Sequence, residues 1–209
     1  QMPETPVAMS WDLELVDVDG DFDLDALISS KAGTSKLFLN DGAGTFTDAS
    51  DQLPEFTNNY RFAPMDIDAD GDVDLLTVNP GNSLREHVLL NDGGVFESGN
   101  EALWPVSENA GEDDNDIAFA DLDGDGDPDF LIGSLSGQDR AMINDDPGLR
   151  ESDVEVFDGP FTPGTLGLAL GDLDGDGKLD ALMAQGEAAD PDRLYFGDEV
   201  AVDVHPPVL

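Results

Sequence analysis

The sequence has no cysteine, only eight lysine and arginine residues and only two histidines among 209 residues. Without cysteine there is no disulfide framework, no cysteine-based zinc site and no thiol catalysis. His87 and His205 have no serine and aspartate at a spacing that supports a catalytic triad, so we interpret both as ordinary strand or tail residues. We therefore expect a protein that is not an enzyme.

Long apolar runs are missing as well. No segment approaches the roughly 18 consecutive apolar residues of a membrane-spanning helix, so we expect no membrane insertion. The scarcity of basic residues leaves 48 acidic residues largely unopposed, and the net charge is −40. Such a field repels phosphate backbones, and we expect no nucleic-acid partner. A saline habitat is one explanation for acidity on this scale.

Extreme acidity with few aromatic residues is typical of disordered chains, but here the acidic residues recur in a fixed order. A nine-residue pattern with Asp at positions 1, 3, 5 and 9 occurs at residues 17–25, 66–74, 121–129 and 172–180. A second landmark, an Asn-Asp-Gly turn or a variant of it, begins 23 to 25 residues after each pattern, at Asn40, Asn91, Asn144 and Gly197. Two landmarks that keep phase through four copies indicate an internal repeat.

Each repeat contains short apolar runs separated by turns. Residues 117–120 alternate before the third acidic loop, as a half-buried strand does, and residues 130–132 form an apolar run after it. A further run leads into each Asn-Asp-Gly turn, which is a strong tight-turn signal, and helix signals are nearly absent. Three or four antiparallel strands in about 50 residues predict a propeller blade.

We therefore predict an all-β fold, a β-propeller built from four antiparallel blades in a single domain, residues 1–209. The blades are expected at approximately 7–51, 58–106, 115–160 and 165–205, with a last outer strand near 200–204. The repeat phase places the first residues in an inter-blade linker, because residues 1–4 are similar to residues 52–55. Three assemblies stay open: a four-bladed ring, part of a larger propeller, or a homodimer that forms an eight-bladed ring.

The acidic loops predict calcium sites, about four Ca²⁺ in all and one in each repeat. Four carboxylates in one tight loop converge, and Ca²⁺ accepts six to eight oxygen ligands in flexible geometry. Position 7 is expected to contribute its backbone carbonyl, which explains why Lys178 is tolerated there, and glycine at position 4 or 6 permits the sharp turn. The candidate ligand positions are Asp17, Asp19, Asp21, Asp23, Asp25, Asp66, Asp68, Asp70, Asp72, Asp74, Asp121, Asp123, Asp125, Asp127, Asp129, Asp172, Asp174, Asp176, Lys178 and Asp180.

The EF-hand loop begins in the same way, but it requires a glutamate at position 12 and a helix on each side. Position 12 is Ile28, Thr77, Ile132 or Met183 in the four loops, and each lies in an expected strand. This difference excludes an EF-hand.

The Asp-x-Asp-Gly-Asp-Gly-x-x-Asp loop, the apolar strand after it and the later Asn-Asp-Gly turn resemble the FG-GAP/VCBS-type repeats of integrin α-chain propellers and of many secreted bacterial proteins. The resemblance implies a calcium-binding β-propeller that is extracellular or at the cell surface and mediates adhesion or ligand recognition. Its partner would be a protein or a glycan that the sequence does not identify. The metal ligands of the family carry over to positions 1, 3, 5 and 9 of the four loops, and we expect the calcium to be mainly structural.

Other interpretations remain open at this stage. The chain could be a lectin-like or accessory domain of a polysaccharide-acting enzyme, or an excised or engineered propeller fragment without a function of its own. Trp11 and Trp104 could stack on a sugar or pack in the core. A basic residue opens the third strand of every repeat and could form a structural ion pair or a solvated charge; these residues are Lys36, Arg85, Arg140 and Arg193.

Overall fold

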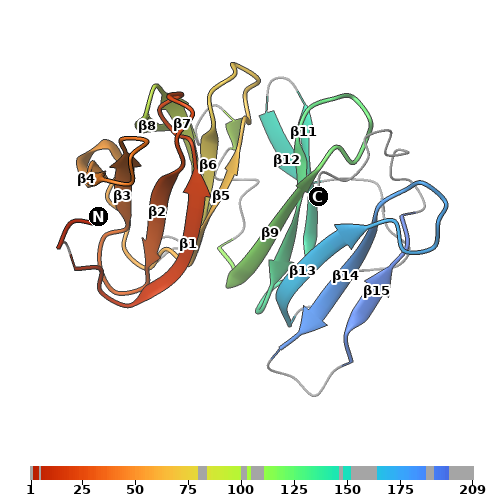
Figure 1. The fold of residues 1–209 in the computed structure, drawn as a ribbon. Helices are drawn as coiled ribbons and strands as arrows, with labels where there is room; N and C mark the ends of the chain where they lie inside the picture. The colour runs from red at the N-terminus through yellow and green to blue at the C-terminus, as the bar shows by residue number, and fades with distance from the viewer. Residues whose placement is uncertain are drawn as a thin grey trace. The chain divides into compact units, whose positions relative to one another are not determined.

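The structure is a computed structural model, and it describes residues 2–4, 6–79, 84–99, 103–104, 111–145, 148–151, 164–186 and 191–197. By its internal contacts the chain forms two compact units, residues 1–111 and 112–209. Each unit contains two antiparallel sheets (Figure 1). The predicted all-β class with four antiparallel blades is therefore confirmed, while closure of the blades into one ring stays a prediction.

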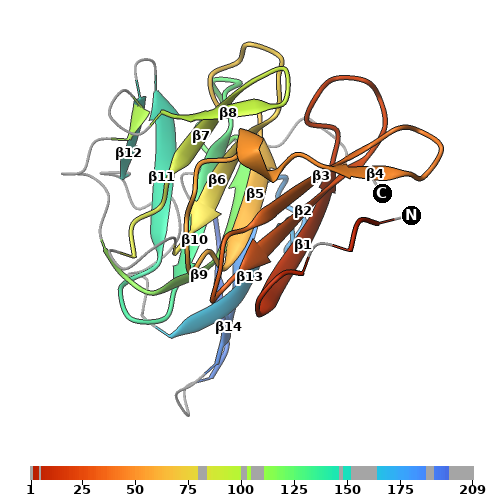
Figure 2. The same cartoon turned by 90° about the vertical axis from the view of Figure 1, so that its left-hand side faces the viewer.

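The first unit contains blades 1 and 2, whose strands follow one another in sheet order (Figure 2). Blade 1 consists of β1 (Ser10–Val16), β2 (Asp25–Ser30), β3 (Lys36–Asn40) and β4 (Phe46–Asp48). A short 3-10 helix, η1 (Ser50–Gln52), follows it. Blade 2 consists of β5 (Arg61–Met65), β6 (Asp74–Val78), β7 (Val88–Asp92) and β8 (Val95–Ser98).

The second unit contains blades 3 and 4. Blade 3 consists of β9 (Asp114–Ala120), β10 (Asp129–Ser134), β11 (Arg140–Asp145) and β12 (Gly148–Glu151). Blade 4 consists of β13 (Thr165–Gly171), β14 (Asp180–Gln185) and β15 (Arg193–Tyr195). The last outer strand expected near residues 200–204 lies outside the described residues.

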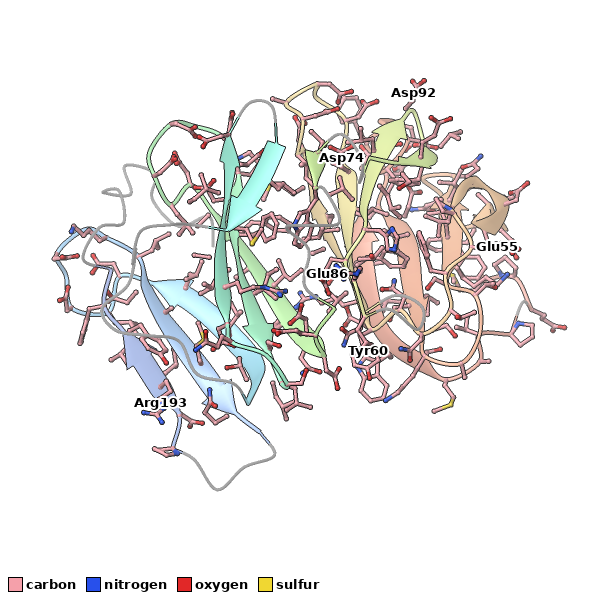
Figure 3. The ribbon with its side chains drawn as sticks, turned by 180° about the vertical axis from the view of Figure 1, so that it is seen from behind. Glu55, Tyr60, Asp74, Glu86, Asp92 and Arg193 are labelled. Carbon is pink, nitrogen blue, oxygen red and sulfur yellow. The ribbon has the colours of Figure 1, made fainter. Side chains whose placement is uncertain are left out.

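Each acidic loop connects the first two strands of its blade. The register pairs the residue before the loop with the ninth residue of the loop, as in Val16 with Asp25 and Met65 with Asp74. Ala120 pairs with Asp129 and Gly171 with Asp180 in the same way. All four loops therefore occupy the same end of their blades. In blade 2, Asp74 and Asp92 lie at that end and Tyr60 lies at the opposite one (Figure 3).

Paired blades share one apolar core in each unit. In the first unit, Leu27 and Leu37 of blade 1 pack with Phe62, Leu75 and Leu89 of blade 2. In the second unit, residues of blade 3 pack with residues of blade 4; the buried members are Leu122, Leu131, Ala141, Ile143, Ala181, Met183 and Tyr195. Full burial of one leucine side chain contributes about 1.5–3 kcal/mol, so this packing is the main reason that the blades stay paired.

Pro64 lies in the middle of β5, opposite Leu75 of β6. Proline has no N–H to donate to a β-ladder and is confined to edge strands, strand ends and bulges. β5 is the first strand of its sheet and has only β6 as a neighbour, so the sheet order explains why proline is tolerated here.

The structure also separates alternatives that the sequence left open. Trp104 is fully buried, whereas the side chain of Trp11 is 55% exposed. Arg140 is buried and forms an ion pair with Asp114 of β9, with 2.5 Å between Nη2 and Oδ2. Lys36 makes a longer contact of 3.9 Å with Asp48. Asp114 and Asp48 are strand residues and lie outside the acidic loops. The two ion pairs therefore each join two strands of one blade. Within the described ranges, no helix has the length and apolarity of a membrane span.

Candidate metal centres

The backbone of each acidic loop passes twice through the left-handed region, at positions 4 and 6. Glycine occupies position 4 in three loops and position 6 in three loops, as the sequence predicts. Ala69 at position 4 of loop 66–74 has φ 59°, and Phe22 at position 6 of loop 17–25 has φ 71°. Positive φ is costly for residues with a Cβ atom, so these two loops hold a strained backbone. The conformation is therefore kept even where the sequence departs from glycine.

These two left-handed turns direct backbone N–H groups at the first aspartate of the loop. Asp17 accepts hydrogen bonds from the N–H of Gly20 at 2.9 Å and of Phe22 at 2.8 Å. Asp172 accepts from Gly175 at 2.7 Å and from Gly177 at 3.1 Å. In the loops of blades 1, 3 and 4, the carboxylates at positions 3 and 5 accept a hydrogen bond from the N–H two residues later, and position 5 does the same in the loop of blade 2. Local hydrogen bonds thus aim these carboxylates into the turn.

The aspartate at position 9 has a different environment. Asp25, Asp74 and Asp129 are 0% exposed and Asp180 is 1% exposed, although each carries a carboxylate. Both oxygens accept backbone N–H groups in every case. In loop 121–129, Oδ2 of Asp129 accepts from Leu122 at 2.6 Å, and Oδ1 accepts from Asn144 at 2.8 Å. The same two bonds recur in the other loops, from residues 18 and 40, 67 and 91, and 173 and 197.

The position-9 carboxylate therefore joins three parts of its blade: the second residue of the acidic loop, the start of the second strand, and the end of the third strand or, in blade 4, the residue that follows it by two. Burial raises the pKa of Asp74 to about 6 and that of Asp129 to about 6, and it also raises the pKa of Asp25. Each of these carboxylates accepts two backbone hydrogen bonds, which favour the charged form and oppose the effect of burial.

The asparagine of the Asn-Asp-Gly turn also binds through its side chain. Asn40 donates from Nδ2 to the carbonyl of Leu24, and Asn91 donates to the carbonyl of Val73, each at position 8 of the loop. Asn91 Nδ2 also donates to the carbonyl of Val18 in blade 1 at 2.7 Å. The turn of blade 2 is therefore tied both to its own acidic loop and to the acidic loop of the neighbouring blade.

Within each of the four loops, carboxylate oxygens lie close enough together to bind one cation. In each loop, three carboxylates offer oxygens that all lie within 4.8 Å of one another. Two oxygens that are each 2.3–2.6 Å from a Ca²⁺ ion lie at most about 5 Å apart, so the spacing fits calcium. The four groups are Asp17, Asp19 and Asp25; Asp66, Asp68 and Asp70; Asp121, Asp123 and Asp129; and Asp172, Asp174 and Asp180.

The clusters do not use every candidate. Asp21, Asp74 and Asp176 are outside the cluster of their own loop among the described residues, although each occupies a predicted ligand position. In blades 1 and 2 the side chain at position 7 faces the glycine of the Asn-Asp-Gly turn instead. Asp72 Oδ2 accepts from the N–H of Gly93 at 3.3 Å, and the carboxylate of Asp23 occupies the space that a Cβ atom on Gly42 would need. The carbonyl role expected for position 7 stays a prediction.

One cluster member lies outside the repeated pattern. Asp145, the last residue of β11, offers an oxygen within 4.8 Å of oxygens from Asp123 and Asp125. The sequence marks Asp145 only as part of the turn landmark. The nearly constant spacing of this landmark from the acidic loop was the available signal, since two landmarks that keep phase can lie together in space.

Repulsion between neighbouring aspartates adds to the effect of burial in these loops. Burial and then the charge of the neighbouring aspartate raise the pKa of Asp19, beside Asp21, and of Asp68, beside Asp70. Asp123 shows the same direction, with burial as the main cause. A bound divalent cation would stabilise the charged form of each carboxylate and relieve this repulsion.

Comparison with known proteins agrees with the repeat. A family model described as "FG-GAP-like repeat" matches residues 17–77, 66–132 and 121–183, so each match begins at the first Asp of a loop and ends in the second strand of the next blade. Among solved structures, the crystal structure of the V. cholerae biofilm matrix protein Bap1 is similar, with 18% identity and a TM-score of 0.42. The match covers 86% of this chain, which spans 29% of that chain. No curated protein matches.

Proposed function

Since the chain belongs to the FG-GAP-like repeat family, we propose that it is a calcium-binding β-propeller module that acts outside the cell in adhesion or ligand recognition, without enzymatic activity. The observation that supports the calcium part of the proposal is that every blade has an oxygen cluster containing positions 1 and 3 of its acidic loop, with position 9 as the third member in three blades and position 5 in blade 2. A single acidic cluster is common on protein surfaces, but four clusters at equivalent repeat positions have a shared purpose.

Calcium in these loops would be mainly structural. The position-9 carboxylate links the loop to two strands, so an ion held by positions 1, 3 and 9 would extend that linkage to the exposed tip of the loop. With millimolar free Ca²⁺ and a Kd near 10⁻⁴ M, each site would add roughly 1–2 kcal/mol to the free energy of unfolding. Four such sites would equal a large part of a typical net stability of about 5–15 kcal/mol.

The test is calcium titration by calorimetry, paired with thermal melts in calcium and in chelator. We expect about four ions per chain and a large rise in Tm with calcium. A variant with Asn at position 3 of every loop (Asp19→Asn, Asp68→Asn, Asp123→Asn and Asp174→Asn) should lose both effects.

A matched control removes four negative charges elsewhere and should keep both effects: Asp51→Asn, Glu55→Gln, Glu97→Gln and Asp192→Asn. The four control side chains are exposed. If calcium gives no heat and no shift in Tm, the calcium proposal is wrong. Loss of both effects in the control as well would mean that net charge, and not the loops, determines the response.

A carbohydrate partner is the second candidate, and the exposed Trp11 favours it. The ring centroid of Trp11 lies 5.4 Å from that of Tyr60 of the neighbouring blade, and the ammonium of Lys31 lies 4.4 Å from the Trp11 ring centroid. Exposed aromatic rings can stack on the apolar faces of sugars. Acidic and neutral polysaccharides titrated against the protein should quench tryptophan fluorescence if they bind here, and Trp11→Ala should abolish the signal while the buried Trp104 remains. Failure of every polysaccharide to change the fluorescence would exclude this partner class for this surface.

A further inference from the structure

Asn91, a residue of β7, lies between the acidic loops of blades 1 and 2. Its side chain is buried and donates from Nδ2 to two carbonyl groups, that of Val18 at 2.7 Å and that of Val73 at 3.0 Å. Val18 is position 2 of loop 17–25, and Val73 is position 8 of loop 66–74. One buried amide group therefore joins two acidic loops that belong to different blades.

On the blade 1 side, the amide group contacts the centre of the oxygen cluster. Val18 stands between Asp17 and Asp19, and its N–H donates to Oδ2 of Asp25 at 3.0 Å. These three aspartates form the cluster of this loop. The turn after β7 also packs on the loop, since a Cβ atom on Gly94 would lie 3.2 Å from Cβ of Asp19. The carbonyl that accepts from the amide is therefore held in place by the residues that would hold a cation.

On the blade 2 side, the backbone N–H of Asn91 donates to Oδ1 of Asp74 at 2.8 Å. The other oxygen of Asp74 accepts the N–H of Ile67 at 2.8 Å. Ile67 stands between Asp66 and Asp68, which are two members of the oxygen cluster of this loop. A short series of hydrogen bonds through Asn91 thus connects the cluster of one loop with the cluster of the other.

Blade 4 has a different residue at this point, because Gly197 occupies the repeat position of Asn91. Gly197 keeps the backbone bond, since its N–H donates to Oδ1 of Asp180 at 3.1 Å. Glycine has no side chain that could reach the acidic loop of blade 3. At this position the second unit therefore keeps the bond within the blade and omits the bond between the loops.

We propose that Asn91 couples calcium binding in loops 17–25 and 66–74, so that an ion in one loop raises the affinity of the other. This inference rests on the calcium sites of the proposed function and concerns their regulation. With one loop occupied, the peptide groups that Asn91 contacts are already ordered, so the second loop loses less conformational freedom when it binds. Coupling of this kind is reciprocal, and one buried hydrogen bond accounts for a factor of about three to ten.

The experiment uses the full chain with the loops of blades 3 and 4 disabled by Asp123→Asn and Asp174→Asn. Calcium is titrated by calorimetry into this protein and into two derivatives, in which Asp19→Asn or Asp68→Asn leaves a single active loop. The coupling factor is the product of the two affinities in the two-loop protein divided by the product of the two single-loop affinities. Repulsion between two bound ions lowers this factor equally in variants of equal charge.

Asn91→Gly reproduces the residue of blade 4 and removes the amide group without changing the charge. The matched control is Asn40→Gly, at the same repeat position of blade 1, where the side chain donates to the carbonyl of Leu24 in its own blade. The same three proteins are made in each background, and circular dichroism melts establish that they fold. We expect the coupling factor to fall about three- to ten-fold with Asn91→Gly and to keep its value with Asn40→Gly.

A second measurement leaves Asn91 intact. In the protein with only loop 66–74 active, calcium should slow hydrogen exchange at the N–H of Val18 in blade 1. The comparison group is the N–H of Leu173 in blade 4, which makes the equivalent bond to Asp180. We expect a smaller effect of calcium there.

Three results would overturn the coupling while leaving the calcium sites in place: an unchanged coupling factor with Asn91→Gly, an equal fall with Asn40→Gly, or equal slowing of exchange at Val18 and Leu173. A complete lack of calcium heat in every protein would have a different meaning. It would show that the loops bind no calcium, so the proposed function and the coupling would both be wrong.

Discussion

The aspartates of one acidic loop divide into two kinds that look alike in the sequence. Asp129 is fully buried, and both of its oxygens are occupied by backbone N–H groups from the loop and from the third strand. Asp125 and Asp123, four and six residues earlier, are exposed and accept local hydrogen bonds from the N–H two residues later. The position-9 aspartate is therefore part of the β-structure as well as, in three of the four loops, a member of the oxygen cluster, whereas the aspartates at positions 3 and 5 are held by the loop alone.

This difference explains why the two sequence landmarks keep phase. The N–H of the turn residue, Asn in three blades and Gly197 in the fourth, donates to the position-9 carboxylate. This hydrogen bond fixes the length of the second and third strands between the loop and the turn. Only the hairpin that joins these strands, at the other end of the blade, can change in length, and the spacing varies by only two residues.

The largest effect should come from replacing the buried aspartate at position 9 of an acidic loop. Asp129→Ala leaves the N–H groups of Leu122 and Asn144 buried without an acceptor, at about 1–3 kcal/mol each, and relief of the buried charge offsets part of this. We expect a loss of about 2–5 kcal/mol in the free energy of unfolding, measured by urea denaturation in chelator.

The matched control is Asp125→Ala in the same loop, which should change stability in chelator by about 0.5 kcal/mol or less because the side chain is exposed. Equal losses for the two variants would show that positions 5 and 9 do not differ as described.

Asp139 is a buried carboxylate between β10 and β11, at the end of blade 3 opposite the acidic loop, so it tests the effect of burial on stability without any contribution from calcium. Asp139 accepts hydrogen bonds from Ser134 N–H at 2.7 Å and from Thr165 Oγ1 at 2.9 Å, and burial raises its pKa to about 6. Its folded-state pKa lies above the unfolded value of about 3.9, so the folded protein binds the proton more tightly. This contribution to stability is complete below about pH 4 and is lost as the pH rises through about 6.

Asp139→Asn should remove that pH dependence, a difference of about 1–3 kcal/mol between pH 4 and pH 7 in chelator. Thermal or urea unfolding of the variant and the wild type across this range measures it, and the exposed Asp192→Asn serves as the control. Parallel pH profiles for the wild type and Asp139→Asn would contradict the assignment.

The exposed aspartates of the acidic loops should contribute to the free energy of unfolding only when calcium is present. Asp19→Asn keeps an oxygen that can accept the N–H of Asp21, so we expect little change in chelator. In millimolar calcium the variant should lose about 1–2 kcal/mol, the contribution of one site. Calcium-dependent melts of Asp19→Asn measure the difference, and a loss of equal size in chelator would show that the residue acts through the fold.

The smallest effect concerns Asp145, which joins only the cluster of loop 121–129. Asp145→Asn should weaken calcium at that single site by a few-fold, less than about 1 kcal/mol, with the other three sites unchanged. Calorimetric titration resolves this as one weakened site in about four. Uniform weakening of all the sites would indicate a general charge effect, which Asp51→Asn would reproduce.

Much of this architecture can be predicted from the sequence, because the repeat appears both in the spacing of the acidic loops and turns and in the apolar pattern of the strands between them. The alternation in residues 117–120 and the apolar run at 130–132 predict strands that the structure places at β9 and β10. The complete burial of the position-9 aspartate could not be predicted, because it depends on the end of the third strand, which lies beside this aspartate only in the folded blade. The left-handed conformation of Phe22 and Ala69 was also hidden, since the repeat imposes it where glycine is missing. The partner of Arg140 lies on β9, 26 residues earlier, and no local pattern links them.

Pro64 has a consequence for the behaviour of the protein in concentrated solution. The first strand of a blade has an open edge, and a row of unpaired backbone groups at such an edge can recruit strands from other molecules and lead to aggregation. β5 carries a proline at its centre, and a proline in an edge strand normally has its backbone nitrogen, which bears no hydrogen, on the side away from the neighbouring strand. An incoming strand would therefore find a missing donor in the middle of the ladder, so this edge of blade 2 is a poor template for fibril growth.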